Sequence, residues 1–370
     1  MRYGELYTKY NEMIYNIESK TDLNKNELKL SEKNDILMPC SGETAIDLAT
    51  ASCIQKDQVA IGGDITVIKT NQYAPFITYY LNQKKTEIAK YAQGVSIVHL
   101  YPKDFKVMNI RIPSINEQKM IIGLLEEITK KEQLLESKYQ QYQEYKKYLM
   151  QQIFTQKLRF VDFNNSSWKD YKFKDLGTVK SGVGFSNKYQ GHLDLDYNFY
   201  KVSDMNLKGN EKVMTRSNNT IDDNLLKDIG VKLIENPSII FAKVGEAIFL
   251  NRKRIAKQPF LIDNNMMAFS PNENVDLEFM YYLATSINFG KYAQTGALPS
   301  YNASDIYSIK CKIPPIEEQK RIGKLLSLAD NKIDFCSNQL NKTQEFKKGL
   351  LQQMFVVQLI LSLLQNKKHI

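Results

Sequence analysis

The sequence predicts an α+β protein with two strand-rich domains, each followed by a long helix, and with the two helices packed against each other. Two repeated segments and one composition signal predict this class. "IPSINEQKMIIGLL" at 112–125 returns as "IPPIEEQKRIGKLL" at 313–326, at a constant offset of 201. "QEYKKYLMQQIF" at 143–154 returns at the same offset as "QEFKKGLLQQMF" at 344–355. Short β-branched and aromatic runs, separated by Gly, Asn and Pro, precede each copy and are typical of strands.

The repeat also sets the expected domain boundaries. Loops tolerate insertions and packed helices do not, so a match without gaps indicates two long helices with the same role. Divergent sequence before each helix indicates two related domains with different surfaces. The expected order is a first strand-rich domain at 1–111, a first spacer helix at 112–160, a second strand-rich domain at 161–312, and a second spacer helix with a tail at 313–370.

Each helix has a recognisable start and an apolar seam. Pro113 and Pro314 end the preceding strand, and acidic residues follow in the first turn, where the helix dipole favours them. Apolar residues then recur at heptad spacing, and because polar residues interrupt both seams, we expect each helix to need the other as its partner. Cys336 lies on the second seam and is interpreted as a small buried hydrophobic residue. The predicted seam residues are Ile121, Leu125, Ile128, Leu135, Tyr142, Leu149, Ile322, Leu326, Ile333, Leu340 and Leu350.

The repeated Glu-Gln-Lys triplet, at 117–119 and 318–320, is the one feature that resembles part of a nuclease motif. It stands at a helix start rather than on a strand with a preceding Asp. We therefore interpret it as a helix cap with surface side chains.

Catalytic and metal-binding patterns are missing. The four cysteines have no CxxC spacing, the three histidines are far apart, and there is no Walker A loop. "SGVGF" at 181–185 lacks the remainder of a dinucleotide fingerprint and is interpreted as a turn. No catalytic residue, metal or bound cofactor is predicted, although a site assembled from distant residues stays open. These absences favour a binding subunit.

Charge points to a polyanionic partner. Lys and Arg number 50 against 41 Asp and Glu, a net charge of +9, which attracts nucleic acid. A basic surface without a partner is the alternative. The amino-terminal residues do not resemble a signal peptide, and the apolar run at 354–364 is too short to span a membrane. We expect a cytoplasmic protein that does not enter a membrane.

Taken together, these motifs resemble the specificity subunit of type I restriction-modification systems. The resemblance rests on the twice-used I-P-x-I-x-E-Q-K start, the long helices ending Q-Q-[IM]-F, and the divergent region before each one. It covers nearly the whole chain. It implies two target recognition domains, each reading half of a split double-stranded DNA sequence and held apart by the two helices, which pack as an antiparallel coiled coil. It also implies two methyltransferase subunits that hold the helices and bring S-adenosylmethionine, motor and endonuclease subunits, and no catalysis or cofactor binding by this chain.

Candidate DNA-binding residues are basic and amide side chains in the divergent regions, which can contact phosphates or base edges. "NRKRIAK" at 251–257 is the densest basic cluster, and a solvated loop is its alternative interpretation. Weaker candidates in the first region come from aligning it with the second. The candidates are Lys180, Asn187, Lys188, Arg216, Lys243, Asn251, Arg252, Lys253, Arg254, Lys257, Ser41, Thr44 and Lys69.

The chain departs from the family pattern at both ends. "RYGEL" at 2–6 aligns best with "KVSDM" at 201–205, so residues 168–200 have no counterpart, and we expect a first recognition domain that is truncated at its amino terminus. After Phe355 the tail reads "VVQLILSLLQNKKHI" and continues the heptad count at Val357, Leu361 and Leu364. A helix extension and an altered reading frame both explain this tail.

Two other classes of function compete with DNA specificity. A coiled-coil scaffold or adaptor would use its strand-rich domains to bind protein, and in the presence of the methyltransferase its binding to duplex DNA would be insensitive to salt or absent. A nuclease or methyltransferase in one chain would show activity by itself. Neither alternative explains a repeat without gaps whose inserts diverge.

Overall fold

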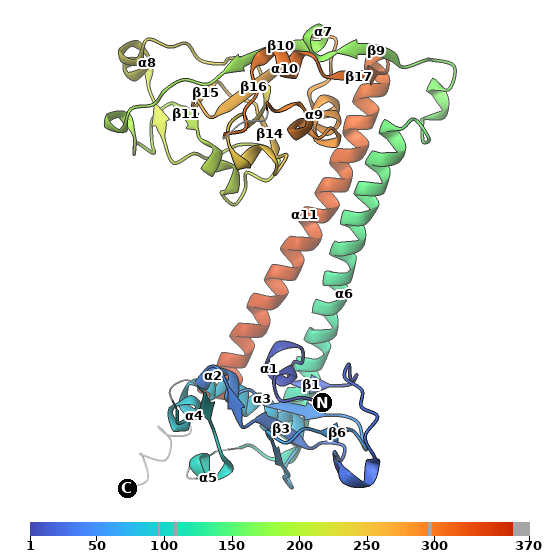
Figure 1. The fold of residues 1–370 in the computed structure, drawn as a ribbon, viewed down its shortest axis with the longest axis vertical. Coiled ribbons are helices and arrows are strands. Elements are labelled where there is room, and N and C mark those ends of the chain that lie inside the picture. The colour runs from blue at the N-terminus through green and yellow to red at the C-terminus, as the bar shows by residue number, and fades with distance from the viewer. Residues whose placement is uncertain (95–96, 107, 109, 111, 295–297, 358–370) are drawn as a thin grey trace. The chain divides into compact units, whose positions relative to one another are not determined.

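The computed structural model describes residues 1–94, 97–106, 108, 110, 112–294 and 298–357. Figure 1 labels its helices and strands. The chain divides into two compact units: unit 1 is Met1–Ser137 with Ser337–Ile370, and unit 2 is Lys138–Cys336. The predicted mixture of helices and strands is confirmed. The tail positions Leu361 and Leu364 lie outside the described residues.

Unit 1 is built on a four-stranded sheet in the order β1-β5-β3-β7, in which β1 runs parallel to β5 and the other pairs are antiparallel. β3 reads "ILMP" and is buried along its whole length, as expected of a central strand. Two short pairs, β2-β6 and β4-β8, complete the strands. The elements are α1 (Glu5–Thr8), β1 (Met13–Ile14), β2 (Lys29–Leu30), β3 (Ile36–Pro39), β4 (Ser41–Gly42), α2 (Ala45–Leu48), β5 (Ser52–Ile54), β6 (Ala60–Ile61), β7 (Ile65–Ile68), α3 (Ala74–Gln83), α4 (Lys85–Ile88), β8 (Val98–His99) and α5 (Pro102–Phe105).

The core of unit 1 joins the sheet to the long helices through α3. Phe76, Tyr79 and Tyr80 of α3 are buried in one cluster with Ile122 and Leu125. The ring of Phe355 joins the same cluster, 5.2 Å from that of Phe76. Apolar burial of this kind is the main favourable term in folding, so α3 fastens the sheet to the helices.

Unit 2 is larger and carries a four-stranded antiparallel sheet in the order β10-β16-β13-β14. A three-stranded sheet, β12-β11-β15, and the pair β17-β9 stand beside it. β13 reads "SIIFA" and is buried throughout, as expected of a central strand. The elements are β9 (Lys169–Lys172), α7 (Phe173–Leu176), β10 (Gly177–Ser181), β11 (Tyr197–Tyr200), β12 (Thr220–Ile221), α8 (Asp223–Ile229), β13 (Ser238–Ala242), β14 (Lys253–Ala256), β15 (Phe260–Ile262), β16 (Met266–Pro271), α9 (Leu277–Ser286), α10 (Ala303–Tyr307) and β17 (Lys310–Ile313).

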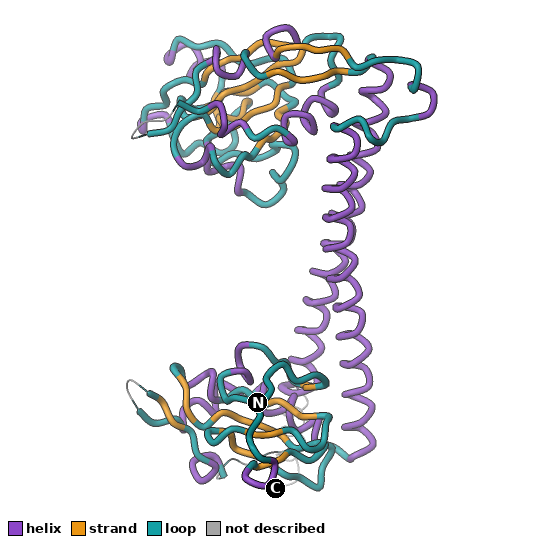
Figure 2. Tube along the Cα trace, turned by 45° about the vertical axis from the view of Figure 1, so that its right-hand side comes forward, coloured by secondary structure: helices purple, strands orange, loops and turns teal. Residues whose placement is uncertain are grey.

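Two long helices, α6 (Ile115–Phe154) and α11 (Ile316–Gln352), each begin three residues after the predicted boundaries at 112 and 313. Within each unit their segments lie side by side (Figure 2). In unit 1, Lys347 forms an ion pair with Glu132 at 2.8 Å, and in unit 2 Lys146 forms one with Asp330. The predicted seam residues are buried or half-buried, as is Cys336, whose expected burial is confirmed. The buried ones are Ile121, Leu125, Ile128, Leu149, Ile322, Leu326 and Leu340, and the half-buried ones are Leu135, Tyr142, Ile333 and Leu350.

A buried glutamine fixes the start of each long helix. The Gln118 amide donates to the Pro113 carbonyl at 2.8 Å and accepts from the backbone N–H of Tyr73, just before α3, at 3.1 Å. Gln319 repeats this arrangement: it donates to the Pro314 carbonyl at 2.9 Å and accepts from the N–H of Asp276, just before α9, at 2.9 Å. One side chain therefore ties the helix start to the unit that precedes it.

This geometry corrects part of the interpretation of the repeated triplet. The capping role is confirmed for Glu117, whose carboxylate accepts from Ser114 and whose pKa is lowered by those bonds. The expected surface position is wrong for Gln118 and Gln319, which are buried. It is also wrong for Glu318, which is buried in an ion pair with Arg159 at 2.7 Å.

We predict that Gln319→Leu lowers the free energy of unfolding by about 1–3 kcal/mol, because it leaves the Asp276 N–H and the Pro314 carbonyl buried without this partner. Urea denaturation followed by circular dichroism measures the change. The exposed Gln151 of α6 supplies the control, Gln151→Leu, which should stay within about 0.5 kcal/mol of the parent protein. Equal losses in the two variants would contradict the assigned role.

Candidate nucleic-acid interface

The basic cluster predicted at 251–257 lies on the turn into β14 and on β14 itself, at one edge of the larger sheet of unit 2. Arg252 is exposed and its guanidinium donates to the side chain of Asn206. Arg254 is half-buried and donates to the Met205 carbonyl at 3.3 Å. Both arginines thus reach the short helical turn at Val202–Asn206, and together these segments form one polar edge.

Lys253 departs from the prediction because it is only 2% exposed. Its ammonium donates to the Asn251 side chain and to the Ile287 carbonyl at 3.0 Å, and it lies 3.9 Å from the ring centroid of Phe289. Burial lowers the pKa of this amine from 10.5 to about 7. Lys253 is therefore an internal anchor of the turn and not a surface cation for DNA.

Asn251 is also an anchor. Its backbone φ of 50° is unusual for a residue other than glycine. Its side chain donates to the Ile287 carbonyl at 3.2 Å and accepts from the Phe289 N–H at 3.0 Å. These bonds hold the turn against the segment that follows α9, so Phe249, Leu250 and Arg252 project from a fixed base.

The other candidates of unit 2 are spread over the molecule. Lys180 lies on β10, at the opposite edge of the sheet from β14, about 14 Å away across three strand spacings. Lys257 is exposed and pairs with Glu278 at 3.4 Å, whereas Lys243 is half-buried after β13. Asn187, Lys188 and Arg216 are exposed on loops and a short helical turn. The structure brings together the 251–254 turn and 202–206, and it leaves the remaining candidates on separate elements.

The three weaker candidates of unit 1 all have partners within the unit. Ser41 lies 3.0 Å from His99 Nδ1, and Thr44 caps α2 by accepting from the Asp47 N–H at 3.2 Å. Lys69 is exposed and pairs with Glu32 at 2.6 Å, which raises the pKa of its amine. Local structural roles therefore account for Ser41 and Thr44, and Lys69 is the one exposed cation among the three.

In each unit a lysine joins the segment at the start of β5 or β14 to the segment that follows α3 or α9. The lysine comes from the strand segment in unit 2 and from the helix segment in unit 1. In unit 2, Lys253 at the start of β14 reaches the carbonyl of Ile287, after α9. In unit 1, Lys85, after α3, reaches the hydroxyl of Thr50, just before β5, at 2.9 Å. Burial lowers the pKa of Lys85 as well. One amine bridges the same pair of segments in each unit.

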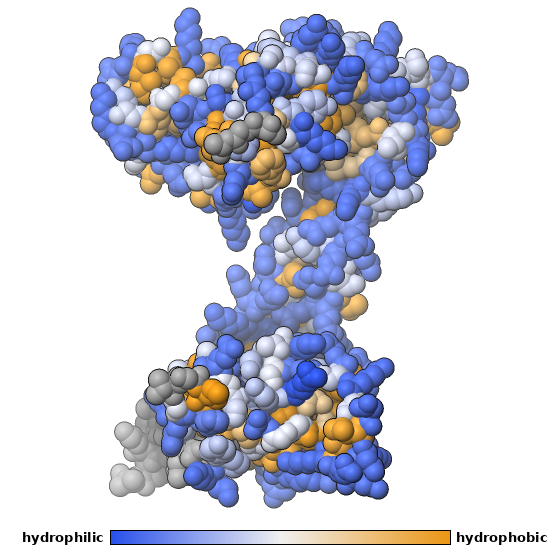
Figure 3. All heavy atoms as spheres, in the orientation of Figure 1, coloured by the Kyte–Doolittle hydropathy of each residue, from blue (hydrophilic) through white to orange (hydrophobic). Residues whose placement is uncertain are grey.

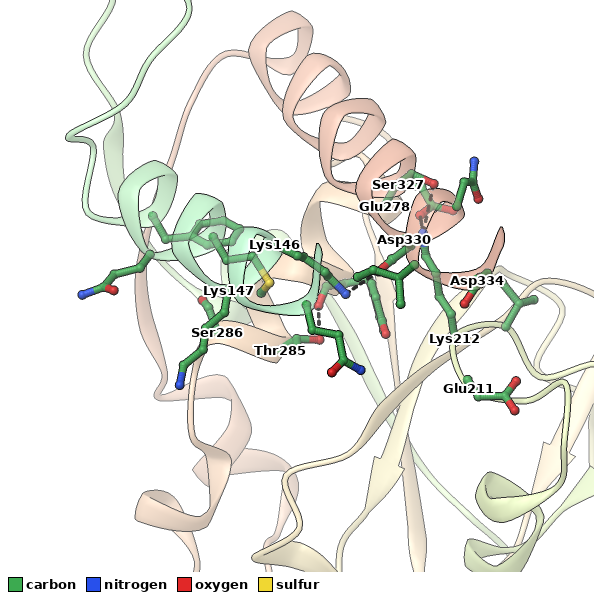
Figure 4. Close-up of a pocket in the computed structure, with 18 of the residues that line it drawn as sticks. Lys146, Lys147, Glu211, Lys212, Glu278, Thr285, Ser286, Ser327, Asp330 and Asp334 are labelled. Atoms are coloured by element: carbon green, nitrogen blue, oxygen red, sulfur yellow. Dashed lines mark hydrogen bonds and ion pairs between the residues drawn. The ribbon is translucent and has the colours of Figure 1, made fainter. Parts of the chain in front are cut away.

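A polar groove of about 1280 Å³ in unit 2 was not foreseen from the sequence. Lys212 is one of the residues that line it (Figure 4), 2.7 Å from Glu278 and 3.5 Å from Asp330, and donates to the Tyr282 hydroxyl at 2.7 Å. Tyr282 donates to Asp330, which also pairs with Lys146. Burial and Asp330 raise the pKa of Tyr282. The network joins the loop that carries Lys212 to α6, α9 and α11, and its charges are largely balanced.

Among the described residues, no group of three or more His, Cys, Asp or Glu could hold a metal ion. Within the same residues, no helix is long and apolar enough to cross a membrane. What the described surface offers is hydrogen-bond donors and positive charge on a rigid sheet edge, which suits contacts with phosphates and base edges.

Comparisons with known proteins agree on one family. The model of the type I restriction modification DNA specificity domain matches residues 3–143 and 165–345. The specificity subunit of the type I restriction enzyme MjaVIII from Methanocaldococcus jannaschii is 21% identical over 293 residues, which cover 75% of this chain and 68% of that protein.

Solved structures show the same fold. The specificity subunit of a type I restriction-modification system from M. genitalium has a TM-score of 0.59 at 18% identity, over 95% of this chain and 90% of that chain. A chain from a structure of type I complex assembly and conformational transition has a TM-score of 0.53 at 13% identity, over 88% and 83% of the two chains.

We predict that Lys253 makes stability depend on pH. Because the amine has a pKa of about 7 in the folded protein and 10.5 as its ordinary value, the unfolded chain binds more protons between these pH values. The free energy of unfolding should therefore rise with pH above about 7, by at most about 1.4 kcal/mol per pH unit. Lys253→Met should remove this rise. Urea denaturation of both proteins at a series of pH values measures it, and equal slopes would mean that the buried amine stays charged.

Proposed function

Because the chain belongs to the type I restriction-modification DNA specificity family, we propose that its two units read the two halves of a bipartite double-stranded DNA target. Family membership confirms the resemblance found in the sequence, and it makes the chain a specificity subunit that is not itself an enzyme. DNA sequence specificity is thus the function of the family, and the division of the target between the units is our proposal.

The observation that carries this proposal is that the units share a framework and differ on their surfaces. Gln118 and Gln319 make the same two bonds at the same place in each unit. The exposed turn of unit 2 carries Arg252, whereas the matching segment of unit 1 is the acidic, capped helix α2. Two related scaffolds with different exposed side chains suit two different half-sites, and each half-site adds to the discrimination.

We propose further that α6 and α11 form an antiparallel coiled coil that acts as a spacer. The ion pair in unit 1 joins position 132 of α6 to position 347 of α11, and the ion pair in unit 2 joins position 146 of α6 to position 330 of α11. Residue numbers therefore rise along α6 as those of their partners fall along α11. Apolar packing follows the same order, since Leu125 clusters with Met354 and Ile153 with Ile322. An antiparallel heptad seam explains both sets of contacts.

The partners in this proposal are two methyltransferase subunits docked on the helices, with motor and endonuclease subunits joining for cleavage. A related structure concerns complex assembly in a type I system, which supports assembly with other subunits. S-adenosylmethionine is held by the methyltransferase, and this chain binds no cofactor. The complex works in the cytoplasm. A net charge of +9 supports attraction to DNA.

A scaffold without DNA readout is the alternative function. It predicts that the chain joins the methyltransferase without directing it to a sequence. The arginines on the β14 edge favour DNA readout, because they face solvent or lie close to it on a segment that internal bonds hold in place.

We predict that this chain directs adenine methylation to an asymmetric two-part motif. The test co-expresses the chain with its methyltransferase subunit in a host without adenine methylation and maps the methylated adenines by sequencing. A motif with a single part would contradict bipartite reading. Methylation at no motif, despite a stable complex, would favour the scaffold.

We predict that Arg252→Ala in the same assay relaxes one position of the half-motif read by unit 2 and leaves the other half unchanged. A bidentate arginine contact to guanine discriminates by about 1–3 kcal/mol. The exposed Lys208 supplies the control, Lys208→Ala, which should keep the whole motif. Equal weakening at all sites would assign Arg252 to a phosphate instead of a base.

A further inference from the structure

A buried carboxylate closes a loop of unit 2. Asp204, in the short helical turn at Val202–Asn206, is fully buried and accepts from the backbone N–H of Lys201 at 2.8 Å. It also accepts from Asn218, 14 residues later, from the backbone N–H at 3.2 Å and from the side-chain amide at 2.8 Å. A buried carboxylate is costly unless it accepts such bonds. Asp204 therefore ties together the two ends of the segment 204–218, which we call the closed loop of unit 2.

Unit 1 repeats this closure with a glutamate. Glu5 is buried and accepts from the backbone N–H of Arg2 at 2.9 Å, again three residues earlier. Its other oxygen accepts from the hydroxyl of Ser19, again 14 residues later. Burial by itself would raise the pKa of Glu5, but the bonds from Ser19 and Arg2 lower it overall. The closure thus belongs to the framework that the two units share.

A buried asparagine fixes the interior of the closed loop of unit 2. The side-chain amide of Asn210 donates to the carbonyls of Asp204 and Arg216, both at 2.8 Å. Its oxygen accepts from the N–H of Thr215 at 2.9 Å and from the N–H of Arg216 at 3.2 Å. These four bonds use both donors and both lone pairs of the amide. The loop therefore has one conformation set from inside, and its exposed side chains stand on a fixed backbone.

The closed loop of unit 2 lies along β14. The N–H of Met214 donates to the Ile255 carbonyl at 2.7 Å. Near the start of the loop, the side-chain oxygen of Asn206 accepts from the Arg252 guanidinium. Asp204 fixes the backbone two residues before Asn206, and Asn206 in turn holds Arg252.

The bond between Asn206 and Arg252 joins two exposed side chains that suit base edges. Arginine reads guanine with two donors, and asparagine reads adenine with one donor and one acceptor. A base contact needs a planar group in a fixed orientation, which this bond supplies for both side chains. Figure 3 shows that most of the drawn face of each unit is hydrophilic, so polarity alone does not mark a reading residue. What distinguishes Asn206 is its place between a buried carboxylate and Arg252.

The side chain at this position differs between the units. Two residues after the buried carboxylate stands Asn206 in unit 2 and Tyr7 in unit 1. The two carboxylates make matching bonds with the backbone, so the difference lies in the side chain that the framework carries. A shared framework with a different side chain is what two readers of different half-sites require.

We propose that Asn206 is a specificity-determining residue of unit 2, which contacts a base beside the one contacted by Arg252, and that Asp204 is its positioning residue. The inference rests on the function proposed above, in which unit 2 reads one half of the DNA target. It adds an uncharged residue outside the basic cluster at 251–257 to the reading edge. Asp204 is buried, so it acts on DNA only through the side chain that it positions.

The test uses the complex of the full chain with its methyltransferase subunit. The motif of the parent complex is mapped first, and methylation rates are then measured on duplexes with one base pair changed at each position of the motif. The variants are Asn206→Ala, Asp204→Asn, the two changes together, and Asp204→Glu. Asn224→Ala and Asp228→Asn, both at exposed positions of α8, are the controls. Thermal unfolding checks that every form folds.

We expect Asn206→Ala to reduce discrimination at least about fivefold at one position of one half-motif and to leave the other half unchanged. Asp204→Asn should relax the same position. The double variant should relax it no further than Asn206→Ala, because both changes act through one contact. Asp204→Glu should restore the parent discrimination, since Glu5 makes the same backbone bond in unit 1. Both controls should keep the whole motif.

Three results would overturn the inference. Unchanged discrimination in Asn206→Ala would do so, and a parent motif with two parts would still support the proposed function. Equal weakening of all positions by Asp204→Asn, or losses that add in the double variant, would make Asp204 a structural residue only. Methylation by the parent complex at no motif would overturn both the inference and the proposed function.

Discussion

The start of each long helix depends on one buried amide. A helix begins with backbone groups that lack partners, and a preceding strand must end where the helix begins. Gln118 and Gln319 meet both requirements, since each holds the carbonyl of a proline before the helix and the N–H that leads into α3 or α9. A residue inserted between the proline and the glutamine would move the amide away from one of its partners. This constraint explains why the repeated segment at the helix start has no gaps.

The buried framework and the exposed side chains of the β14 edge obey different constraints. In unit 2, apolar burial on β13 and β16, together with the Lys212 network, fixes the β14 edge relative to α6 and α11. The exposed side chains of that edge contribute little to this packing. Because buried groups hold the β14 edge in place, its exposed side chains can be replaced with little effect on the packing of the unit.

The sequence predicted the features that depend on local spacing. The helix starts, which fall three residues after the boundaries predicted at 112 and 313, and the burial of Cys336 follow from prolines and heptads. It did not predict the burial of Lys253 or Gln319, because their partners, Ile287 and Asp276, lie 34 and 43 residues away. From sequence alone, a lysine in a basic run is predicted to be exposed, and only its neighbours in space show that it is buried. The DNA-contacting residues stay predictions for the same reason.

The bridging lysines, Lys85 and Lys253, limit which segments of the two units can be combined in a hybrid unit. In unit 2 the lysine, Lys253, lies on the earlier of the two joined segments and its acceptor, Ile287, on the later one. In unit 1 the acceptor, Thr50, lies on the earlier segment and the lysine, Lys85, on the later one. Suppose that unit 1 and unit 2 recombine at a point between these two segments. One product would then carry both lysines in the same buried place, and the other product would carry neither. The first buries excess charge and the second leaves polar groups without their bridge, and both are costly. A hybrid of the two units thus keeps this buried arrangement only when both segments come from the same unit.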